Sequence, residues 1–164
     1  MTKIYLGCDH AGFELKEKIK VYLSGLEYEV EDRGSFSFVA DDDYPDFVRQ
    51  VAEAVAADKG SFGVILGGSG QGEAICANRV KGVRAVVFYG PKLPTEKIDM
   101  EGRTSMDTFE MIKLARRHND ANILSIGERF TTEDEAKFAV ELFVTTPFPG
   151  DERHLRRINK IDLI

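Results

Sequence analysis

The sequence predicts an α/β fold in which helices cover both faces of an open parallel sheet. Short apolar runs of strand length alternate with amphipathic stretches along the chain. Five such β-then-α units follow one another, and the predicted strands are apolar on both faces, which is typical of buried parallel strands. With 164 residues, of which 43% are hydrophobic, the chain is expected to form one globular domain over residues 1–164.

The first two units occupy the N-terminal third of the chain. The pattern predicts a strand over 3–8, a helix over 13–26, a weaker strand over 28–33 and a helix over 46–57. In the first helix Leu15, Ile19 and Leu23 recur at helical spacing. Pro45 precedes the second helix, where its fixed φ suits a first helical turn.

The remaining three units contain a glycine-rich loop and a long connection. We expect a strand over 62–66, a helix over 73–80, a strand over 84–89, a helix ending near 118, a strand over 122–127 and a helix over 133–144. Thr132 and Glu135 have the spacing of a capping box for the last of these helices. His118 and Asn119 are expected in the loop before the fifth strand.

Composition and charge exclude several classes of protein. The formal net charge of -6 argues against a general nucleic-acid surface, because binding the phosphate backbone needs a basic face. The apolar runs are too short to span a membrane, and the N-terminus lacks the features of a signal peptide, so we expect a cytoplasmic protein. Cys8 and Cys76 are expected to be buried free thiols rather than a disulfide or metal pair.

Ligands of open parallel sheets bind beyond the carboxyl ends of the strands. One segment expected in this region is the glycine loop "GGSGQGE", residues 67–73. Bare backbone N–H groups in such a loop can wrap an anion. A P-loop would need Lys and a hydroxyl residue after its last glycine, and a dinucleotide fingerprint would need Gly or Ala where Glu73 stands. Glu73 would repel a nucleotide phosphate, but it can act as a base on a neutral carbon acid. The alternative is that Glu73 only complements the helix dipole.

Two further clusters favour chemistry. Asp9 and His10 directly follow the first strand, and "DERHLRRINK" near the C-terminus gathers basic residues in an otherwise acidic chain. If this segment is helical, Arg153 and Arg157 share one face and can grip one phosphate; the alternative is a solvated tail. Metal catalysis by the histidines is the weaker alternative, because no tight ligand spacing such as HExxH is present.

An ordered set of motifs carries a family resemblance over nearly the whole chain except residues 90–110. The segments "YLGCDHAGFELK", "DDDYPDF", "ILGGSGQGEAICANRVKGVRA", "RRHNDANILSIGERF" and "ERHLRRI" resemble ribose-5-phosphate isomerase type B, within the sugar-phosphate isomerase family that includes galactose-6-phosphate isomerase subunits. The resemblance implies a Rossmann-like three-layer α/β/α sandwich with a five-stranded parallel sheet. It also implies a homodimer with active sites between subunits, whose dimers can pair into tetramers, and a C-terminal basic helix from about residue 150 that reaches the partner.

The family has two patterns for its base. One branch carries a cysteine at the position of Gly67 and an apolar residue at that of Glu73; the other carries glycine and glutamate, as this chain does. The chain therefore resembles the glutamate-base branch, and neither Cys8 nor Cys76 matches the cysteine. The implied reaction interconverts ribose 5-phosphate and ribulose 5-phosphate through an enediolate in the pentose phosphate pathway, and it needs no cofactor.

Roles for individual residues follow from the same resemblance. Glu73 would shuttle the proton, while the Ser69 hydroxyl and the loop amides stabilise the enediolate, and His118 would open the furanose ring. The expected substrate-binding residues are Asp9, His10, Tyr44, Gly68, Gly70, Gln71, Gly72, Asn119, Arg129, Arg153 and Arg157, with phosphate held by His10 and the arginines. A helix N-terminus should lower the pKa of Glu73 and desolvation should raise it, and the sequence leaves that balance open.

The connection "GPKLPTEKIDMEGRTSMDTFEM" departs from the family. It is longer than the usual strand-to-helix loop and follows the fourth strand at the expected active edge. It can serve as a lid, a selectivity element or an oligomer contact. Substrate identity therefore stays open: an isomerase of a six-carbon aldose phosphate, such as allose or galactose 6-phosphate, and a non-catalytic sugar-phosphate sensor are the alternatives.

Overall fold

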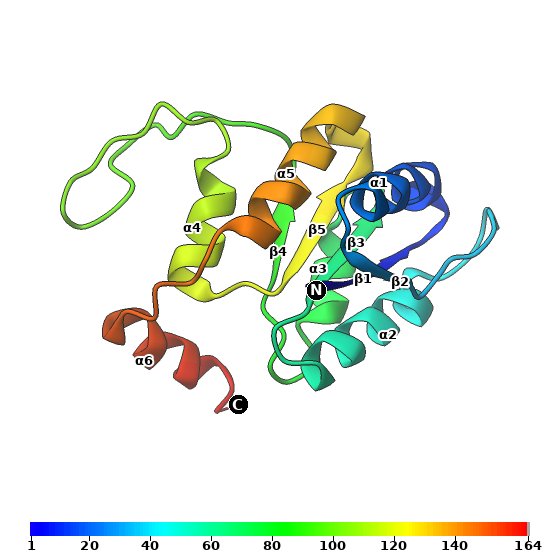
Figure 1. Cartoon of the computed structure of the whole chain (residues 1–164), viewed down its shortest axis with the longest axis horizontal. Coiled ribbons are helices and arrows are strands. Elements are labelled where there is room, and N and C mark those ends of the chain that lie inside the picture. Colours follow the sequence, from blue (N-terminus) through cyan, green and yellow to red (C-terminus); the bar gives the residue numbers. More distant parts are fainter. Residues whose placement is uncertain (164) are drawn as a thin grey trace.

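A computed structural model describes residues 1–163. Five strands form one sheet: β1 (Lys3–Cys8), β2 (Glu29–Asp32), β3 (Phe62–Gly67), β4 (Ala85–Phe88) and β5 (Ile123–Gly127). All pairings are parallel, in the order β2-β1-β3-β5-β4 (Figure 1). The helices are α1 (Phe13–Gly25), α2 (Tyr44–Ala57), α3 (Gln71–Ala77), α4 (Glu110–Asn119), α5 (Glu133–Thr145) and α6 (Glu152–Ile161), with short 3-10 turns η1 (His10–Gly12) and η2 (Glu128–Phe130).

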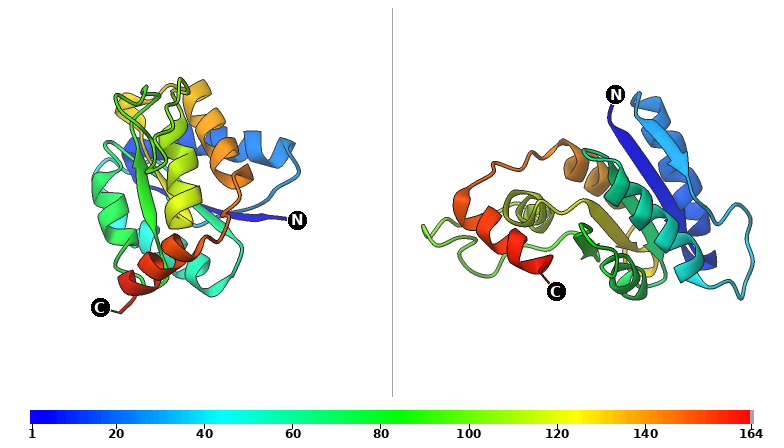
Figure 2. Two further views of the ribbon diagram at one scale, coloured as in Figure 1. Left: turned by 90° about the vertical axis from the view of Figure 1, so that its left-hand side faces the viewer. Right: turned by 90° about the horizontal axis from the view of Figure 1, so that it is seen from below.

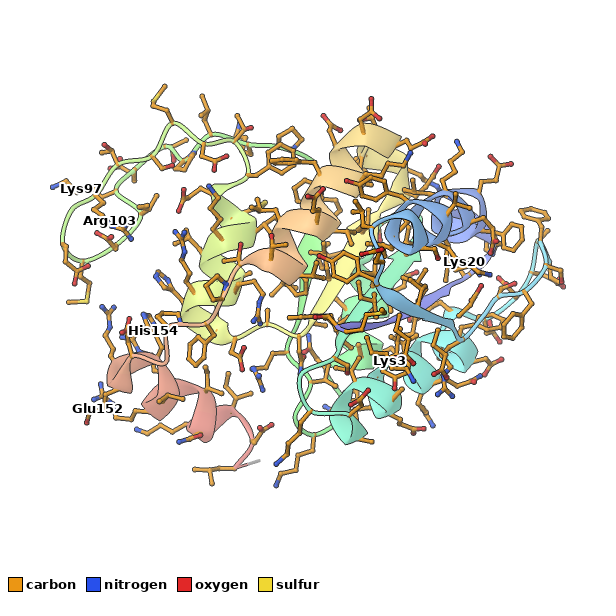
Figure 3. All side chains as sticks on the ribbon, viewed as in Figure 1. Lys3, Lys20, Lys97, Arg103, Glu152 and His154 are labelled. Carbon is orange, nitrogen blue, oxygen red and sulfur yellow. The ribbon has the colours of Figure 1, made fainter. Side chains whose placement is uncertain are left out.

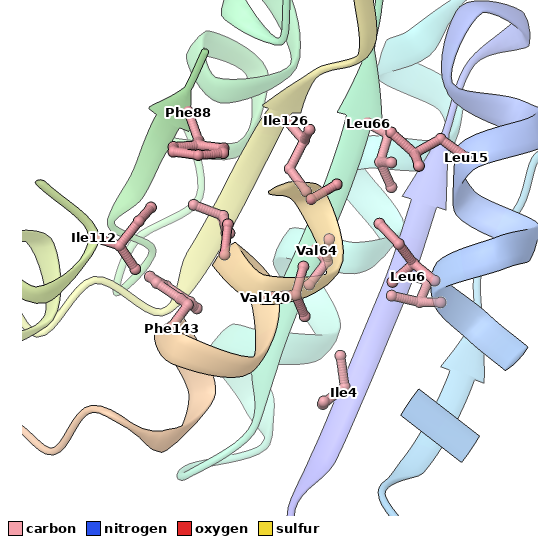
Figure 4. Close-up of a cluster of buried hydrophobic side chains, with 14 of the residues drawn as sticks. Ile4, Leu6, Leu15, Val64, Leu66, Phe88, Ile112, Ile126, Val140 and Phe143 are labelled. Atoms are coloured by element: carbon pink, nitrogen blue, oxygen red, sulfur yellow. The ribbon is translucent and has the colours of Figure 1, made fainter. Parts of the chain in front are cut away.

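The helices form two layers on opposite faces of the sheet (Figure 2). One buried cluster joins α1, α4 and α5 to alternate strand residues such as Leu6, Val64 and Ile126 (Figure 4). The other joins α2 and α3 to residues of the opposite parity, including Tyr5 and Ile65. This alternation follows from the two-residue period of strands and confirms the predicted three-layer α/β/α sandwich.

The strand order brings three loops together at one edge of the sheet. Cys8 at the end of β1 lies opposite Leu66, and Gly67 at the end of β3 lies opposite Gly127 at the end of β5. Because all strands run in the same direction, the segments after β1, β3 and β5 emerge side by side. The fold thus assembles the carboxyl edge from residues far apart in the sequence.

Several boundaries differ from the sequence-based expectation, and the helix expected over 46–57 begins at Tyr44. The helix expected over 73–80 begins earlier, at Gln71, and ends at Ala77. The expectation that His118 and Asn119 lie in a loop was wrong, because both belong to the last turn of α4. Asp120 caps the C-terminal end of that helix: it adopts a left-handed conformation with φ of 44° and donates its N–H to the Arg116 carbonyl.

Local signals at other helix ends are confirmed. Thr132 Oγ1 accepts the Glu135 N–H, and the Glu135 carboxylate accepts the Thr132 N–H at 2.9 Å, which completes the capping box of α5. Pro45 lies in the first turn of α2. The C-terminal basic segment is helical, as α6, so Arg153 and Arg157 share a face. None of the helices within residues 1–163 is both long and apolar enough to cross a bilayer.

The connection between β4 and α4 is the longest segment without regular structure. Residues 89–109, all of which the structure describes, contain no helix or strand. The connection leaves the carboxyl end of β4, and its tip extends beyond α4 on the side of the molecule where α6 lies (Figure 1). The connection therefore runs from the carboxyl edge of the sheet to the side of the molecule where the C-terminal helix lies.

Candidate active site

The glycine loop turns sharply between β3 and α3. Gly70 has φ of +73°, a left-handed conformation that favours glycine, and precedes the first residue of the helix. Ser125 Oγ of β5 donates a hydrogen bond of 2.7 Å to the Gly70 carbonyl and so fixes the loop against the neighbouring strand. The loop is therefore a rigid cradle with amide N–H groups at the start of α3.

Glu73 projects from the first turn of α3 onto the floor of this cradle. Its side chain is buried, with 5% exposed, and a Cβ built on Gly67 would lie 1.8 Å from Glu73 Oε1. Burial raises the pKa of Glu73, and the negative charge of Asp9 raises it further, against a lowering by the backbone N–H of Glu73 itself. The net upward shift makes this carboxylate a stronger base than an exposed glutamate.

Asp9 and His10 form the neighbouring wall. Asp9 is buried and accepts the N–H groups of Ala11 at 3.0 Å and Gly12 at 3.3 Å, which caps η1. His10 Nδ1 lies 2.8 Å from Asp42 Oδ1, and the His10 N–H donates to the same oxygen at 2.9 Å. The first turn after β1 therefore holds both side chains in fixed positions.

Asp42 was not assigned a role from the sequence. It orients the imidazole of His10, and its other oxygen, Oδ2, is buried without a hydrogen-bond partner among the described residues. The available signal was the acidic run at 41–43, directly before Tyr44. Nothing in that run distinguished Asp42 from its neighbours, because only the folded loop brings it to His10.

Tyr44 and Arg129 lie against the glycine loop from two other elements. A Cβ on Gly72 would lie 2.8 Å from Tyr44 Cζ, and a Cβ on Gly68 would lie 3.0 Å from Arg129 Cζ. The backbone N–H of Arg129 also donates a hydrogen bond of 3.3 Å to the Gly68 carbonyl. These glycines therefore let a ring and a guanidinium approach the loop closely.

Ser69 and Gln71 occupy the outer part of the loop. Ser69 is exposed, and its Oγ accepts the Gln71 N–H at 3.3 Å. The Ser69 hydroxyl keeps its own proton available as a donor to a ligand in this geometry.

His118 belongs to a second cluster. It stacks on His154 of α6 with ring centroids 4.4 Å apart and an interplanar angle of 11°. Burial lowers the pKa of His118, and the charges of His154 and Arg153 lower it further. These three residues line a cavity of about 650 Å³. Figure 3 shows His154 at the start of α6, on the side that faces the long connection.

The two clusters lie at opposite ends of the sheet. Glu73, Asp9 and His10 lie beyond the carboxyl ends of the strands, whereas His118 and Asn119 directly precede the amino end of β5. A strand of five residues spans roughly 16 Å. Within one chain the structure therefore does not bring His118, Asn119, Arg153 or Arg157 to Glu73.

Neither cysteine joins the cradle. Both are free thiols, Cys8 buried and Cys76 partly buried, and burial raises the pKa of Cys8 to about 12. A thiol with such a pKa is protonated at neutral pH and a poor nucleophile. Among residues 1–163, no three side chains of His, Cys, Asp or Glu come together as a metal site.

Comparisons with known proteins agree with this architecture. Ribose-5-phosphate isomerase B of Mycolicibacterium paratuberculosis is 42% identical over 157 residues, covering 96% of this chain and 87% of that protein. The structure of ribose 5-phosphate isomerase from Thermotoga maritima superposes with a TM-score of 0.84 at 40% identity, with 99% of each chain covered. That of ribose-5-phosphate isomerase B from Mycoplasma genitalium, which contains bound ribulose 5-phosphate, gives a TM-score of 0.83 at 34% identity, covering 98% of this chain and 94% of that one.

A family model described as Ribose/Galactose Isomerase matches residues 4–95 and 104–161. The match includes both clusters and passes over residues 96–103 of the long connection. Since it covers most of the chain, and relatives above 30% identity match over nearly full length, the chain belongs to the ribose/galactose isomerase family.

Proposed function

We propose that this chain is an aldose-ketose isomerase that interconverts ribose 5-phosphate and ribulose 5-phosphate. Its family and the names of its relatives support this reaction, and a solved relative holds ribulose 5-phosphate. The observation that carries the proposal is the Glu73 carboxylate, buried against Gly67 with its pKa raised. A buried carboxylate of raised basicity beside backbone amides suits proton transfer at a carbon next to a carbonyl.

The reaction needs one base and one cradle. With the open-chain aldose bound, Glu73 removes the proton from C2, and the electron pair of the broken bond forms the C1–C2 double bond of an enediolate. The amides of Gly68, Gly70, Gln71 and Gly72 and the Ser69 hydroxyl stabilise the oxygen charge. Glu73 then returns the proton to C1, and the O2 hydroxyl proton passes to O1, so that the carbonyl is left at C2 and a hydroxyl at C1.

The remaining groups bind the sugar and its phosphate. Asp9 and Tyr44 hold sugar hydroxyls at the cradle, and His10 and Arg129 bind phosphate there. His118, whose neutral form is favoured by its lowered pKa, takes the O1 hydroxyl proton and donates a proton to the ring oxygen as the bond from C1 to that oxygen breaks, which opens the furanose ring. Asn119 contacts the hydroxyls, and Arg153 and Arg157 complete the phosphate grip.

These groups meet only if two chains combine. One chain supplies the cradle around Glu73, and α4 and α6 of a second chain supply His118 and the two arginines. A homodimer with two shared sites satisfies both chains, and such dimers can pair further into a tetramer. The chain is one domain over residues 1–164, and its C-terminal helix, from about residue 150, reaches the partner.

Incorporation of solvent deuterium tests the chemistry. When the protein is incubated with ribose 5-phosphate in deuterated water, deuterium should appear on the sugar carbon that receives the proton. Glu73→Gln should lower the rate of this incorporation by about a hundredfold or more, while the variant still binds phosphate. Phosphate binding without exchange in the wild-type protein would instead identify a sensor.

A six-carbon aldose phosphate is a second candidate substrate. The observation that favours it is the long connection, whose residues 96–103 lie outside the family match. Residues 97–101 and Arg103 of this segment line the cavity beside His118. A panel of pentose and hexose phosphates in the deuterium assay ranks the two by kcat/KM. A cytoplasmic role in the pentose phosphate pathway, with no bound cofactor, fits the first candidate.

A further inference from the structure

The segment that the family model passes over has a defined local structure. Ile98 donates its N–H to the Arg103 carbonyl at 2.8 Å, which closes residues 98–103 into a turn. Gly102 has φ of +84°, and its N–H donates to the Asp99 carbonyl at 3.3 Å. Residues 96–103 therefore form a closed turn at the tip of the long connection.

An ion pair fixes the direction of Arg103 within this turn. Asp99 accepts the Arg103 N–H at 2.9 Å and also the guanidinium Nε, and its side chain is only 7% exposed. The Arg103 side chain is 59% exposed. Asp99 thus holds one edge of the guanidinium and leaves its terminal N–H groups available to a ligand.

The turn lines the same cavity as the second cluster. Lys97, Asp99 and Arg103 line it from the connection, and His118 and Arg153 line it from α4 and α6. Arg103 and Asp99 both act electrostatically on His118, which places the ion pair near its imidazole. Figure 3 shows Lys97 and Arg103 on the connection, on the same side of the molecule as His154.

The cavity contains positive groups without an acidic partner. Among the described residues, neither Lys97 nor Arg153 has a carboxylate within 4.0 Å. Glu101 and Asp151 also line the cavity, but both are exposed and make no ion pair there within residues 1–163. Their charges disfavour an anion beside them, so the arginine side is the favourable position for a phosphate.

We propose that residues 96–103 are a substrate-binding segment that this chain adds to the family's site, and that Arg103 binds the phosphate of the sugar phosphate alongside Arg153. The inference rests on the proposed function for its substrate. A planar guanidinium with two free terminal groups can donate two parallel hydrogen bonds to one phosphate, whereas a lysine ammonium acts as a point charge. Asp99 is a positioning residue, because it acts only through Arg103.

Binding of inorganic phosphate to the full-length protein, measured by calorimetry, tests the anion site without turnover. Arg103→Ala should raise the Kd about tenfold or more, as expected for loss of charge-assisted hydrogen bonds. Lys92→Ala is the matched control: Lys92 is exposed on the same connection and does not line the cavity, so its Kd should change by less than about twofold. Equal Kd values for wild type and Arg103→Ala would overturn the inference.

Replacement of residues 96–103 by Gly-Gly provides a second test. Because the family model continues at residue 104 and residues 98 and 103 are already hydrogen-bonded to each other, the shortened chain should melt like wild type. It should show the raised phosphate Kd of Arg103→Ala. A shortened, folded chain that binds phosphate as wild type does would contradict the proposal.

Turnover separates this inference from the proposed function. Arg103→Ala and Asp99→Asn should raise KM for ribose 5-phosphate with less effect on kcat, because both weaken binding and leave Glu73 in place. If wild type turns over ribose 5-phosphate and both variants keep its KM, only the role of the segment is wrong. If wild type shows no turnover, the proposed function is wrong, and the phosphate measurements still decide whether Arg103 binds an anion.

Discussion

The carboxylate of Glu73 occupies the space that a side chain at Gly67 would fill, since a Cβ there falls 1.8 Å from Oε1 and 2.2 Å from Cδ. The two positions are six residues apart, and the turn of the glycine loop brings them together. A residue larger than glycine at 67 and an inward glutamate at 73 therefore exclude each other. This explains why glycine and glutamate occur together in the branch that the sequence resembles.

Gly67→Ala should displace the Glu73 carboxylate and lower kcat by about a hundredfold or more, since a small misplacement of a catalytic group is costly. The double variant with Glu73→Gln should be no slower than Glu73→Gln alone, because both changes remove the same group. Gly25→Ala, where an added Cβ meets nothing within 4 Å, serves as the control. Additive losses in the double variant would refute this relationship.

Glu73→Gln should stabilise the fold while it removes activity. Burial raises the pKa of Glu73 in the folded chain, so its contribution to stability is present below the unfolded pKa and is lost as the pH rises through the folded pKa. Near neutral pH the glutamine variant should gain about 0.5–2 kcal/mol in urea unfolding. The gain should shrink as the pH falls through the raised folded pKa of Glu73 and should be absent below its unfolded pKa, about 4. A gain that does not depend on pH would show that ionisation of Glu73 is not its cause.

Asp9→Asn should move the acid limb of kcat/KM to lower pH. The negative charge of Asp9 raises the pKa of Glu73, so its removal lets Glu73 ionise at lower pH, and asparagine retains an oxygen that can cap η1. Asp46→Asn, in the first turn of α2, is the control and should leave the limb in place. An acid limb that stays in place in Asp9→Asn would mean that Glu73 does not set it.

Two inactive variants should restore activity when their chains are mixed. If sites are shared, a dimer of a Glu73→Gln chain and a His118→Asn chain contains one site with both native groups. When the two chains exchange at random in an equal mixture, about half of the dimers are mixed, and each mixed dimer has one native site of two. The mixture should therefore recover about a quarter of wild-type activity. Each variant by itself is the control. No recovery after chain exchange, verified by mass spectrometry of tagged chains, would place both groups in one chain.

Lys16→Met should destabilise the fold far more than Lys20→Met. Both Nζ atoms lie 2.7 Å from Asp32 Oδ2, but the Lys16 side chain is 0% exposed and also donates to the Ser35 carbonyl at 2.9 Å, whereas Lys20 is 39% exposed. Loss of a buried partner costs about 3–5 kcal/mol, and loss of an exposed one at most about 1 kcal/mol. Chemical denaturation of the two variants measures the difference. Similar losses would show that burial does not set the strength of these pairs.

Much of the fold followed from local patterns. The five strands, the helices between them and the capping box at Thr132 appear close to their predicted positions, because apolar periodicity and caps act within a few residues. The sequence predicts a loop at His118 because helix ends have weak signals, and the left-handed Asp120 that caps α4 has no strong sequence mark. The contact of Asp42 with His10 was also missed, since it joins residues 32 apart.

The sequence by itself determined the α/β class, the glycine loop with its carboxylate and the family to which the chain belongs, because these depend on the order and spacing of residue types. Only the tertiary structure decided the direction of the pKa shift of Glu73. Burial against Gly67 raises this pKa more than the neighbouring backbone N–H lowers it. The tertiary structure also decided that His118 lies at the opposite end of the sheet from Glu73 and that the turn at Asp99 and Arg103 faces the His118 cavity. Burial and distance arise from contacts between segments that are remote in the chain, and no local pattern encodes them.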